Sequence, residues 1–159
     1  MSQQTNFQCV KDFHELFDHP NFTELNTEIF TQNPNLVDLR VKLIEEELNE
    51  LKDALKNKDF VETADALSDL LYVIYGAGHV FGINLDETFK AVHESNMTKA
   101  CKTEQEAIET IEFLRETQPR YDPAYREFKN YYIVYDKNTG KALKSKYYKE
   151  VDLTFIKKN

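Results

Sequence analysis

The chain has 159 residues, of which 41% are hydrophobic and 30% charged, and its formal net charge is −8. This length is enough for one domain with a sizeable core, which we expect to cover residues 1–159. The acidic balance excludes a nucleic-acid binder of the basic kind. A membrane-spanning protein is excluded as well, because the longest apolar run, Leu70 to Tyr75, is far too short to cross a bilayer.

The cysteines and the N-terminal residues indicate the cellular compartment. Cys9 and Cys101 show neither a pairing pattern nor a metal-binding spacing, which is typical of free thiols in a reducing environment. The N-terminal sequence MSQQTNF contains neither the basic nor the apolar region of a secretory signal. We therefore expect a cytoplasmic protein with no membrane partner and no nucleic-acid partner.

Apolar residues at helical spacing predict five helices. The first is followed by a polar stretch with a turn at Asn33-Pro34-Asn35. In the second, apolar residues recur at alternating steps of four and three, as in the seam of an antiparallel bundle. Asp59, Asn84 and Thr103 each precede a glutamate by three residues and are predicted N-caps. The predicted helices run from about 8–18, 36–55, 59–79, 84–95 and 103–118.

The C-terminal part has a different character. Residues 131–148, YYIVYDKNTGKALKSKYY, place β-branched and aromatic residues on both sides of Asn138-Thr139-Gly140, which predicts a β-hairpin. The predicted fold is therefore mainly α, an antiparallel helical bundle with a helical core at about 8–118 and a small C-terminal β-hairpin and tail at about 121–159.

Negative charge is concentrated on the second and third predicted helices. Residues 45–69 contain nine acids and three lysines. On a wheel of about 100° per residue, Glu47 and Glu50 share an arc with apolar residues, and Glu46 lies beside Glu50 at its edge. On the next helix Glu62, Asp65 and Asp69 fall within about 60° of one another. The short turn between the helices requires antiparallel packing, which brings the two acidic faces together.

A solvated surface with helical salt bridges is the simplest interpretation of such a charge run. It fails here because like charges are stacked at i and i+4, Glu46 on Glu50 and Asp65 on Asp69. Glu62 has an alternative role in a capping box. Half-buried carboxylates without cationic partners either raise their pKa values or bind a metal. Several oxygen ligands on facing helices suit Mg²⁺, with Mn²⁺ as a substitute.

These residues also carry a resemblance to a known family. Glu46-Glu47-Leu48-Asn49-Glu50, followed by Glu62-Thr63-Ala64-Asp65, resembles the EExxE…ExxD signature of the all-α nucleoside triphosphate pyrophosphohydrolases. The stretches DALSDLLYVIYGAGHVFGI, VHESNMTK and DKNTGKALKSKYYKEVDL are similar to the MazG-like, phosphoribosyl-ATP pyrophosphohydrolase-like branch. The likeness covers roughly residues 8–101 and 131–156, and residues 102–130 look like an insertion.

The resemblance implies a metal-dependent hydrolysis of nucleoside triphosphates to nucleoside monophosphate and pyrophosphate. It assigns Glu47, Glu50, Glu62 and Asp65 as metal ligands, and Glu46 as the catalytic residue that orients or deprotonates the attacking water. In other branches an acid precedes the Asp-Leu-Leu-Tyr stretch by three residues. That position is Ala66 here, so Asp69 is assigned as an extra ligand or as a support behind the metal ligands.

A second group of residues steps by three along the chain. His93, Asn96 and Lys99 can line one side of a helix and its end, where a lysine also complements the helix dipole without any ligand. The resemblance assigns Asn96 and Lys99 to substrate phosphate. His93 stays open between surface and substrate. Tyr72, close to the acids on its helix, is open between core packing and substrate contact.

Three functions follow from these interpretations. The preferred one is a Mg²⁺-dependent pyrophosphohydrolase that cleans the pool of particular nucleoside triphosphates, acting as a homodimer or homotetramer. The second is phosphoribosyl-ATP hydrolysis in histidine biosynthesis, which has the same chemistry but needs a different pocket. The third is a catalytically silent helical module used for oligomerisation, against which the unpaired carboxylates argue.

Overall fold

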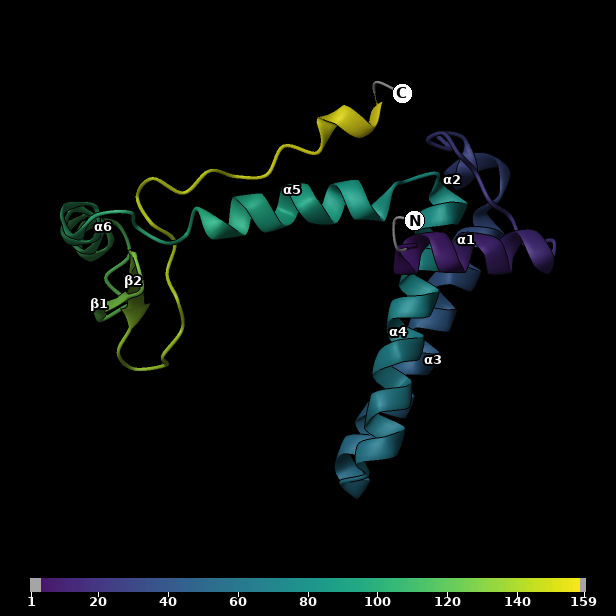
Figure 1. Ribbon diagram of the computed structural model, residues 1–159, viewed down its shortest axis with the longest axis horizontal. Coiled ribbons are helices and arrows are strands. Elements are labelled where there is room, and N and C mark those ends of the chain that lie inside the picture. Colours follow the sequence, from purple (N-terminus) through teal and green to yellow (C-terminus); the bar gives the residue numbers. More distant parts are fainter. Residues whose placement is uncertain (1–3, 158–159) are drawn as a thin grey trace. The chain divides into compact units, whose positions relative to one another are not determined.

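The computed structural model describes residues 4–157 and confirms a mainly helical fold with a small antiparallel sheet near the C-terminus (Figure 1). The elements are α1 (Asn6–Leu16), α2 (Ile29–Gln32), α3 (Pro34–Asn57), α4 (Phe60–Phe81), α5 (Leu85–Met97), α6 (Glu104–Thr117), β1 (Pro123–Phe128), β2 (Tyr131–Asp136) and a 3₁₀ turn (Thr154–Lys157). Within residues 4–157 no single helix is both long and apolar enough to cross a membrane, although the bent pair of α4 and α5 reaches that threshold by length and composition.

The described residues fall into two compact units. The first holds the chain as far as Thr88 together with the 3₁₀ turn, and the second holds residues 89–153. The single domain expected over 1–159 stays a prediction, and the two units are described separately below.

The first unit is built on α3 and α4, which lie side by side as a helical hairpin (Figure 1). Lys58 adopts the left-handed conformation, with φ 57°, and ends α3. Asp59 then caps α4 as predicted, because its Oδ1 accepts from the N–H groups of Val61 at 2.9 Å and Glu62 at 3.1 Å. Such a cap satisfies backbone donors that have no partner inside the helix. The tight connection fixes which faces of the two helices meet.

Two buried histidines attach α1 and the following loop to α4. His14 donates from Nδ1 to the carbonyl of Pro20 at 2.8 Å, and His79 donates from Nε2 to the carbonyl of Phe7 at 2.8 Å. The Phe7 ring stacks on His79 with 3.8 Å between centroids. Burial lowers the pKa of both histidines, so that each is held in its neutral form.

Gly82 ends α4 in the left-handed conformation, at a point where the neighbouring backbone leaves no room for a side chain. Its φ is 66°, and a side-chain carbon at this position would overlap the carbonyl of Glu24. The close approach lets the loop between α1 and α2 run along the C-terminal end of α4. There the N–H of Phe22 donates to His79 O at 2.9 Å, and the N–H of Asn26 donates to Phe81 O at 3.0 Å.

The start of α3 differs from the prediction. Asn33-Pro34-Asn35, predicted as a turn, is the beginning of the helix, with Asn33 as its N-cap residue and Pro34 at the first position. Proline fits there because the first helical N–H has no partner inside the helix. The polar residues before it also contain the short helix α2, which sequence spacing did not reveal.

The second unit packs α6 against the β1–β2 sheet. Its core consists of Cys101, Ala107, Leu114, Val134 and Leu143. Both cysteines of the chain are free, as predicted.

The hairpin was predicted in the wrong place. The paired strands are Pro123–Phe128 and Tyr131–Asp136, and the turn between them has Lys129 in the left-handed conformation. The segment at Asn138–Gly140 closes only an isolated bridge between Tyr135 and Ala142. The reason lies in Asp136, whose buried carboxylate accepts from Asp122 N, Asn138 N and Thr139 Oγ1, so that the turn is satisfied by a side chain rather than by a strand ladder.

Candidate metal and nucleotide site

The acidic faces of α3 and α4 meet around Glu47. Its Oε2 is buried and has no hydrogen-bond partner within residues 4–157. The pKa of Glu47 is raised, first by burial and then by the charges of Glu50, Asp69, Glu46 and Asp65. Both effects disfavour the ionised form. Glu47 therefore has one buried oxygen and lies among four carboxylates that repel it.

A hollow of about 280 Å³ opens on the same pair of helices. Glu50, Glu62 and Asp65, three of the four predicted metal ligands, line it. Asp53 and the capping Asp59 contribute two further carboxylates. Among the described residues its lining contains no cationic side chain. The hollow is therefore a region of concentrated negative charge that favours a cation.

The carboxylates do not converge on a single point. In the part of the chain that the structure describes, no three His, Cys, Asp or Glu side chains are arranged so that they could hold a metal ion together. The four-ligand set of Glu47, Glu50, Glu62 and Asp65 therefore stays a prediction. The donor chemistry nevertheless fits a hard cation, because carboxylate oxygens are the preferred ligands of Mg²⁺ and one of them lacks any other partner.

Glu46 lies at the edge of the cluster. Its Oε1 is 3.7 Å from Nζ of Lys42, one helical turn earlier, and about half of its side chain is exposed. A surface pair of this kind contributes little stability. Glu46 is therefore accessible to solvent, and its role toward the attacking water stays a prediction.

Tyr72 faces α1 rather than the acids. Its ring meets the ring of Phe13 edge-on with 5.5 Å between centroids, and burial raises its pKa. It also lines an apolar hollow of about 240 Å³ with Cys9, Val10 and Leu71. Packing thus accounts for Tyr72, and a substrate contact stays a prediction.

The predicted phosphate-binding residues lie in the second unit, at the end of α5. Nζ of Lys99 donates to Oδ1 of Asn96 at 2.7 Å, so these two side chains meet as their spacing predicts. That bond uses one of three ammonium protons and leaves the charge available. His93 is exposed on the same helix.

Comparison with known proteins identifies the family. The sequence profile described as phosphoribosyl-ATP pyrophosphohydrolase matches residues 10–96, more than half of the chain. The chain belongs to the phosphoribosyl-ATP pyrophosphohydrolase family. It is also similar to uncharacterized protein L479 of Acanthamoeba polyphaga mimivirus, with 30% identity over 91% of this chain and 92% of that protein.

Membership of the phosphoribosyl-ATP pyrophosphohydrolase family supports a nucleotide pyrophosphohydrolase activity in general. The matched span contains every carboxylate of the cluster and ends at Asn96. It does not reach α6 or either strand, so the second unit lies almost entirely outside the family match.

Two residues of this family member escaped sequence reasoning. Asp53 was not predicted as a site residue, yet it lines the acidic hollow, and its position three residues after Glu50 was the available signal. Arg40 is buried on α3, two turns before Glu47, and its Nε has no hydrogen-bond partner within residues 4–157. Burial lowers the pKa of Arg40. No sequence signal distinguished it from an exposed arginine.

Proposed function

We propose that the protein is a metal-dependent nucleoside triphosphate pyrophosphohydrolase that converts (d)NTP to (d)NMP and pyrophosphate. The observation that carries the proposal is the buried Oε2 of Glu47, which lies among four other carboxylates and has no hydrogen-bond partner within residues 4–157. A buried acceptor without a partner is costly unless a ligand satisfies it. The family to which the chain belongs supports the same general chemistry.

Glu47, Glu50, Glu62 and Asp65 would hold Mg²⁺, or Mn²⁺ in its place. When bound, the metal neutralises phosphate charge and lowers the pKa of a coordinated water. Glu46 accepts the proton of the attacking water, and the α–β phosphoanhydride bond breaks as pyrophosphate leaves.

Asp69 either adds a metal ligand or supports the metal ligands from behind. Asn96 and Lys99 bind phosphate oxygens, with His93 beside them, and Tyr72 contributes to the wall on which the nucleoside rests.

The protein would act in the cytoplasm as a homodimer or homotetramer. The support is the number of large apolar side chains that α3 and α4 leave exposed, since monomeric proteins rarely leave contiguous apolar surface of this kind uncovered. A second copy with the same surface would bury it symmetrically. The exposed residues are Leu39, Val41, Leu48, Leu55, Phe60, Val61, Leu67, Leu71, Tyr72 and Ile74.

Phosphoribosyl-ATP is the second candidate substrate, and the description of the matching family profile favours it. The reaction is the same hydrolysis of an α–β phosphoanhydride bond, with a larger base to accommodate. House-cleaning of the nucleotide pool stays the preferred proposal, and Asn96 and Lys99, which can serve any triphosphate chain, are compatible with both substrates.

Pyrophosphate release with Mg²⁺ distinguishes the candidates. The substrates are the canonical NTPs and dNTPs, modified nucleotides and phosphoribosyl-ATP, each also tested with Glu47→Ala/Glu50→Ala. We expect turnover of particular (d)NTPs by the wild type and none by the double variant. Turnover of phosphoribosyl-ATP alone would select the second candidate, and failure of every substrate despite demonstrated Mg²⁺ binding would leave a silent helical module.

A further inference from the structure

The second unit contains a cavity of about 400 Å³ that neither the acidic cluster nor the family match explains. Three separate segments of the chain form it, namely the residue just after α5, the end of α6 with the following loop, and the strand-like segment at 141–144. The lining residues are Lys99, Leu114, Gln118, Arg120, Tyr121, Lys141, Ala142, Leu143 and Lys144. Its size lies within the range of small-molecule sites.

Charge is the distinguishing property of this cavity. Four of its lining residues are cationic, and among the described residues none of its lining is acidic. In a chain with a net charge of −8, such a local excess of positive charge is unusual. Arg120 and the three lysines together supply point charges and a planar donor group, the combination that proteins use for phosphate oxygens.

Most of that charge is uncompensated. Of the four cations that line the cavity, only Lys144 has an ion-pair partner within residues 4–157, namely Glu150 at 3.8 Å, whose side chain is 85% exposed. Lys99 donates to a neutral amide, and the Arg120 guanidinium lies 4.8 Å from the ring centre of Tyr121. The carbonyl end of α6 contributes roughly half a negative charge, which is small beside three or four full positive charges.

The walls of the cavity are held in place by backbone bonds. Ser145 donates to Lys99 O at 3.2 Å, Leu143 donates to Val134 O at 2.9 Å, and the Tyr121 N–H donates to Gln118 O at 3.1 Å. Leu114 and Leu143 are buried and make an apolar floor. The backbone positions from which the cationic side chains project are therefore fixed.

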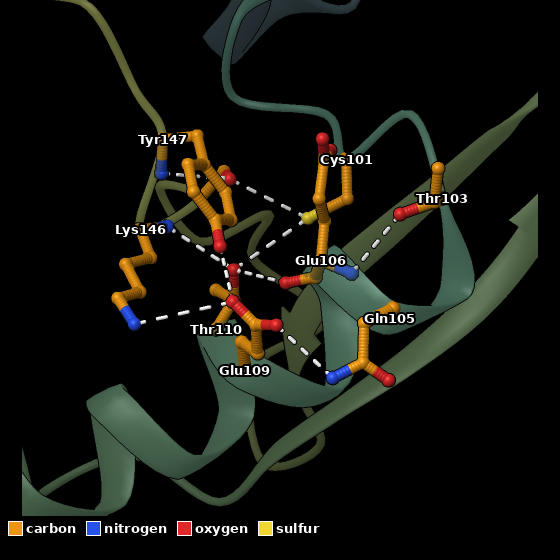
Figure 2. A network of polar contacts seen from close by, with 9 residues as sticks. Cys101, Thr103, Gln105, Glu106, Glu109, Thr110, Lys146 and Tyr147 are labelled. Atoms are coloured by element: carbon orange, nitrogen blue, oxygen red, sulfur yellow. Dashed lines mark hydrogen bonds and ion pairs between the residues drawn. The ribbon is translucent and has the colours of Figure 1, made fainter.

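Figure 2 shows how the segment after the cavity is fastened to α6. The N–H of Lys146 donates to Thr110 Oγ1 at 3.1 Å, and Thr110 Oγ1 donates to Glu106 O at 2.7 Å. The hydroxyl of Tyr147 donates to Glu109 on the same helix. This network holds residues 145–147 on the helix and so fixes the direction in which 141–144 approaches the cavity.

We propose that this cavity is a binding site for a di- or triphosphate chain. A phosphate chain carries three to four negative charges near neutral pH, which matches the four cations, and it spans more of the cavity than one phosphate group would. The chain could belong to a nucleotide or to free pyrophosphate, and the chemistry of recognition is the same. The inference goes beyond the proposed function and shares only Lys99 with it, because binding here needs no metal and no hydrolysis.

Isothermal titration calorimetry on the full chain in EDTA tests the inference. The probes are pyrophosphate, tripolyphosphate, ATP, adenosine, orthophosphate and sulfate at matched ionic strength. We expect pyrophosphate and tripolyphosphate to bind one per chain, more tightly than orthophosphate or sulfate. ATP that binds at least tenfold more tightly than tripolyphosphate identifies a nucleotide as the source, and equal affinity identifies a free phosphate chain.

Lys141→Gln/Lys144→Gln is the informative variant, because both side chains are exposed and the core is untouched. Losing two charge-assisted contacts should raise the Kd by at least about tenfold. Lys129→Gln/Lys137→Gln makes the same charge change on the hairpin, away from the cavity lining, and should leave the Kd unchanged.

Three results would contradict the proposed site. The first is that the wild type binds no phosphate chain. The others are that the Lys141→Gln/Lys144→Gln variant binds phosphate chains as tightly as the wild type does, and that the wild type binds sulfate as tightly as it binds a phosphate chain. Glu47→Gln/Glu50→Gln separates this inference from the proposed function. Phosphate-chain binding in EDTA persists in that variant even if no nucleotide is ever hydrolysed.

Discussion

Replacing Glu47 with glutamine should stabilise the metal-free protein at neutral pH. The substitution removes the charge from a carboxylate whose Oε2 is buried without a partner and which four other acids repel. An unsatisfied buried acceptor costs about 1–3 kcal/mol, and more when it is charged. The amide is still a buried polar group, so we expect a gain near 1 kcal/mol, which is about 2–4 °C in Tm for a domain of this size.

The pH dependence of the stability gained by Glu47→Gln follows from the direction in which the pKa of Glu47 is shifted. The pKa of Glu47 is higher in the folded protein than its ordinary value of 4.5. The folded state therefore holds the proton more tightly, and the contribution of Glu47 to stability is lost as the pH rises through the folded pKa. The difference between Glu47→Gln and wild type should be small at pH 4 and complete at pH 7.

Magnesium should make the wild type more stable than Glu47→Gln, which is the opposite of the order expected without metal. A ligand at about 100 times its Kd stabilises the folded state by about 2.7 kcal/mol, or about 5–10 °C here. Wild type should show this increase and Glu47→Gln should lose most of it. Thermal melts followed by circular dichroism, in EDTA and in MgCl₂, measure both effects.

Glu45→Gln is the matched control, since Glu45 is exposed on the same helix and the charge change is identical. Its Tm should respond to Mg²⁺ as the wild type does. The reasoning is refuted if Glu47→Gln lowers the metal-free Tm at pH 7, or if its Mg²⁺ response equals that of the wild type.

Other predictions concern the scaffold. Asp59→Ala should cost about 0.5–2 kcal/mol of unfolding free energy in urea titrations, because two helix N–H groups lose their acceptor, while Asp59→Ser should retain most of it. Burial lowers the pKa values of His14 and His79, so below pH 6.5 the unfolded state binds more protons than the folded state. The contribution of the two histidines to the free energy of unfolding should therefore fall as the pH drops below 6.5. A free energy of unfolding that stays constant between pH 7 and 5 in the Glu47→Gln background would contradict this. Gly82→Ala should lower Tm more than Gly140→Ala, since both have positive φ but only Gly82 is crowded by backbone.

The helices and their caps were predictable because their signals are local. The spacing of apolar residues placed all four ends of α3 and α4 within two residues of their observed positions. Asp59, Asn84 and Thr103 accept the backbone bonds expected of caps. These patterns act within one turn of helix and need no tertiary information.

Features that depend on distant contacts were not predictable. Strand β1 was missed because its pairing with β2 gives it structure, while its own sequence lacks a clean alternation. The cations of the basic cavity, Lys99, Arg120 and the lysines of 141–144, come from three separate segments. No spacing along the chain therefore predicts the cavity. In the acidic cluster, sequence indicated which carboxylates share a face, but only the structure shows that Glu47 carries the buried oxygen.

The most direct test of the account is a quantitative product analysis of nucleoside triphosphate hydrolysis by the wild type and by Glu50→Gln, each with Mg²⁺ and with EDTA. The account predicts equal amounts of nucleoside monophosphate and pyrophosphate from the wild type with Mg²⁺. It predicts no product in EDTA and at least a hundredfold loss of rate, about 2.7 kcal/mol, in a folded Glu50→Gln variant. Release of orthophosphate in place of pyrophosphate, or an undiminished rate in Glu50→Gln, would contradict it.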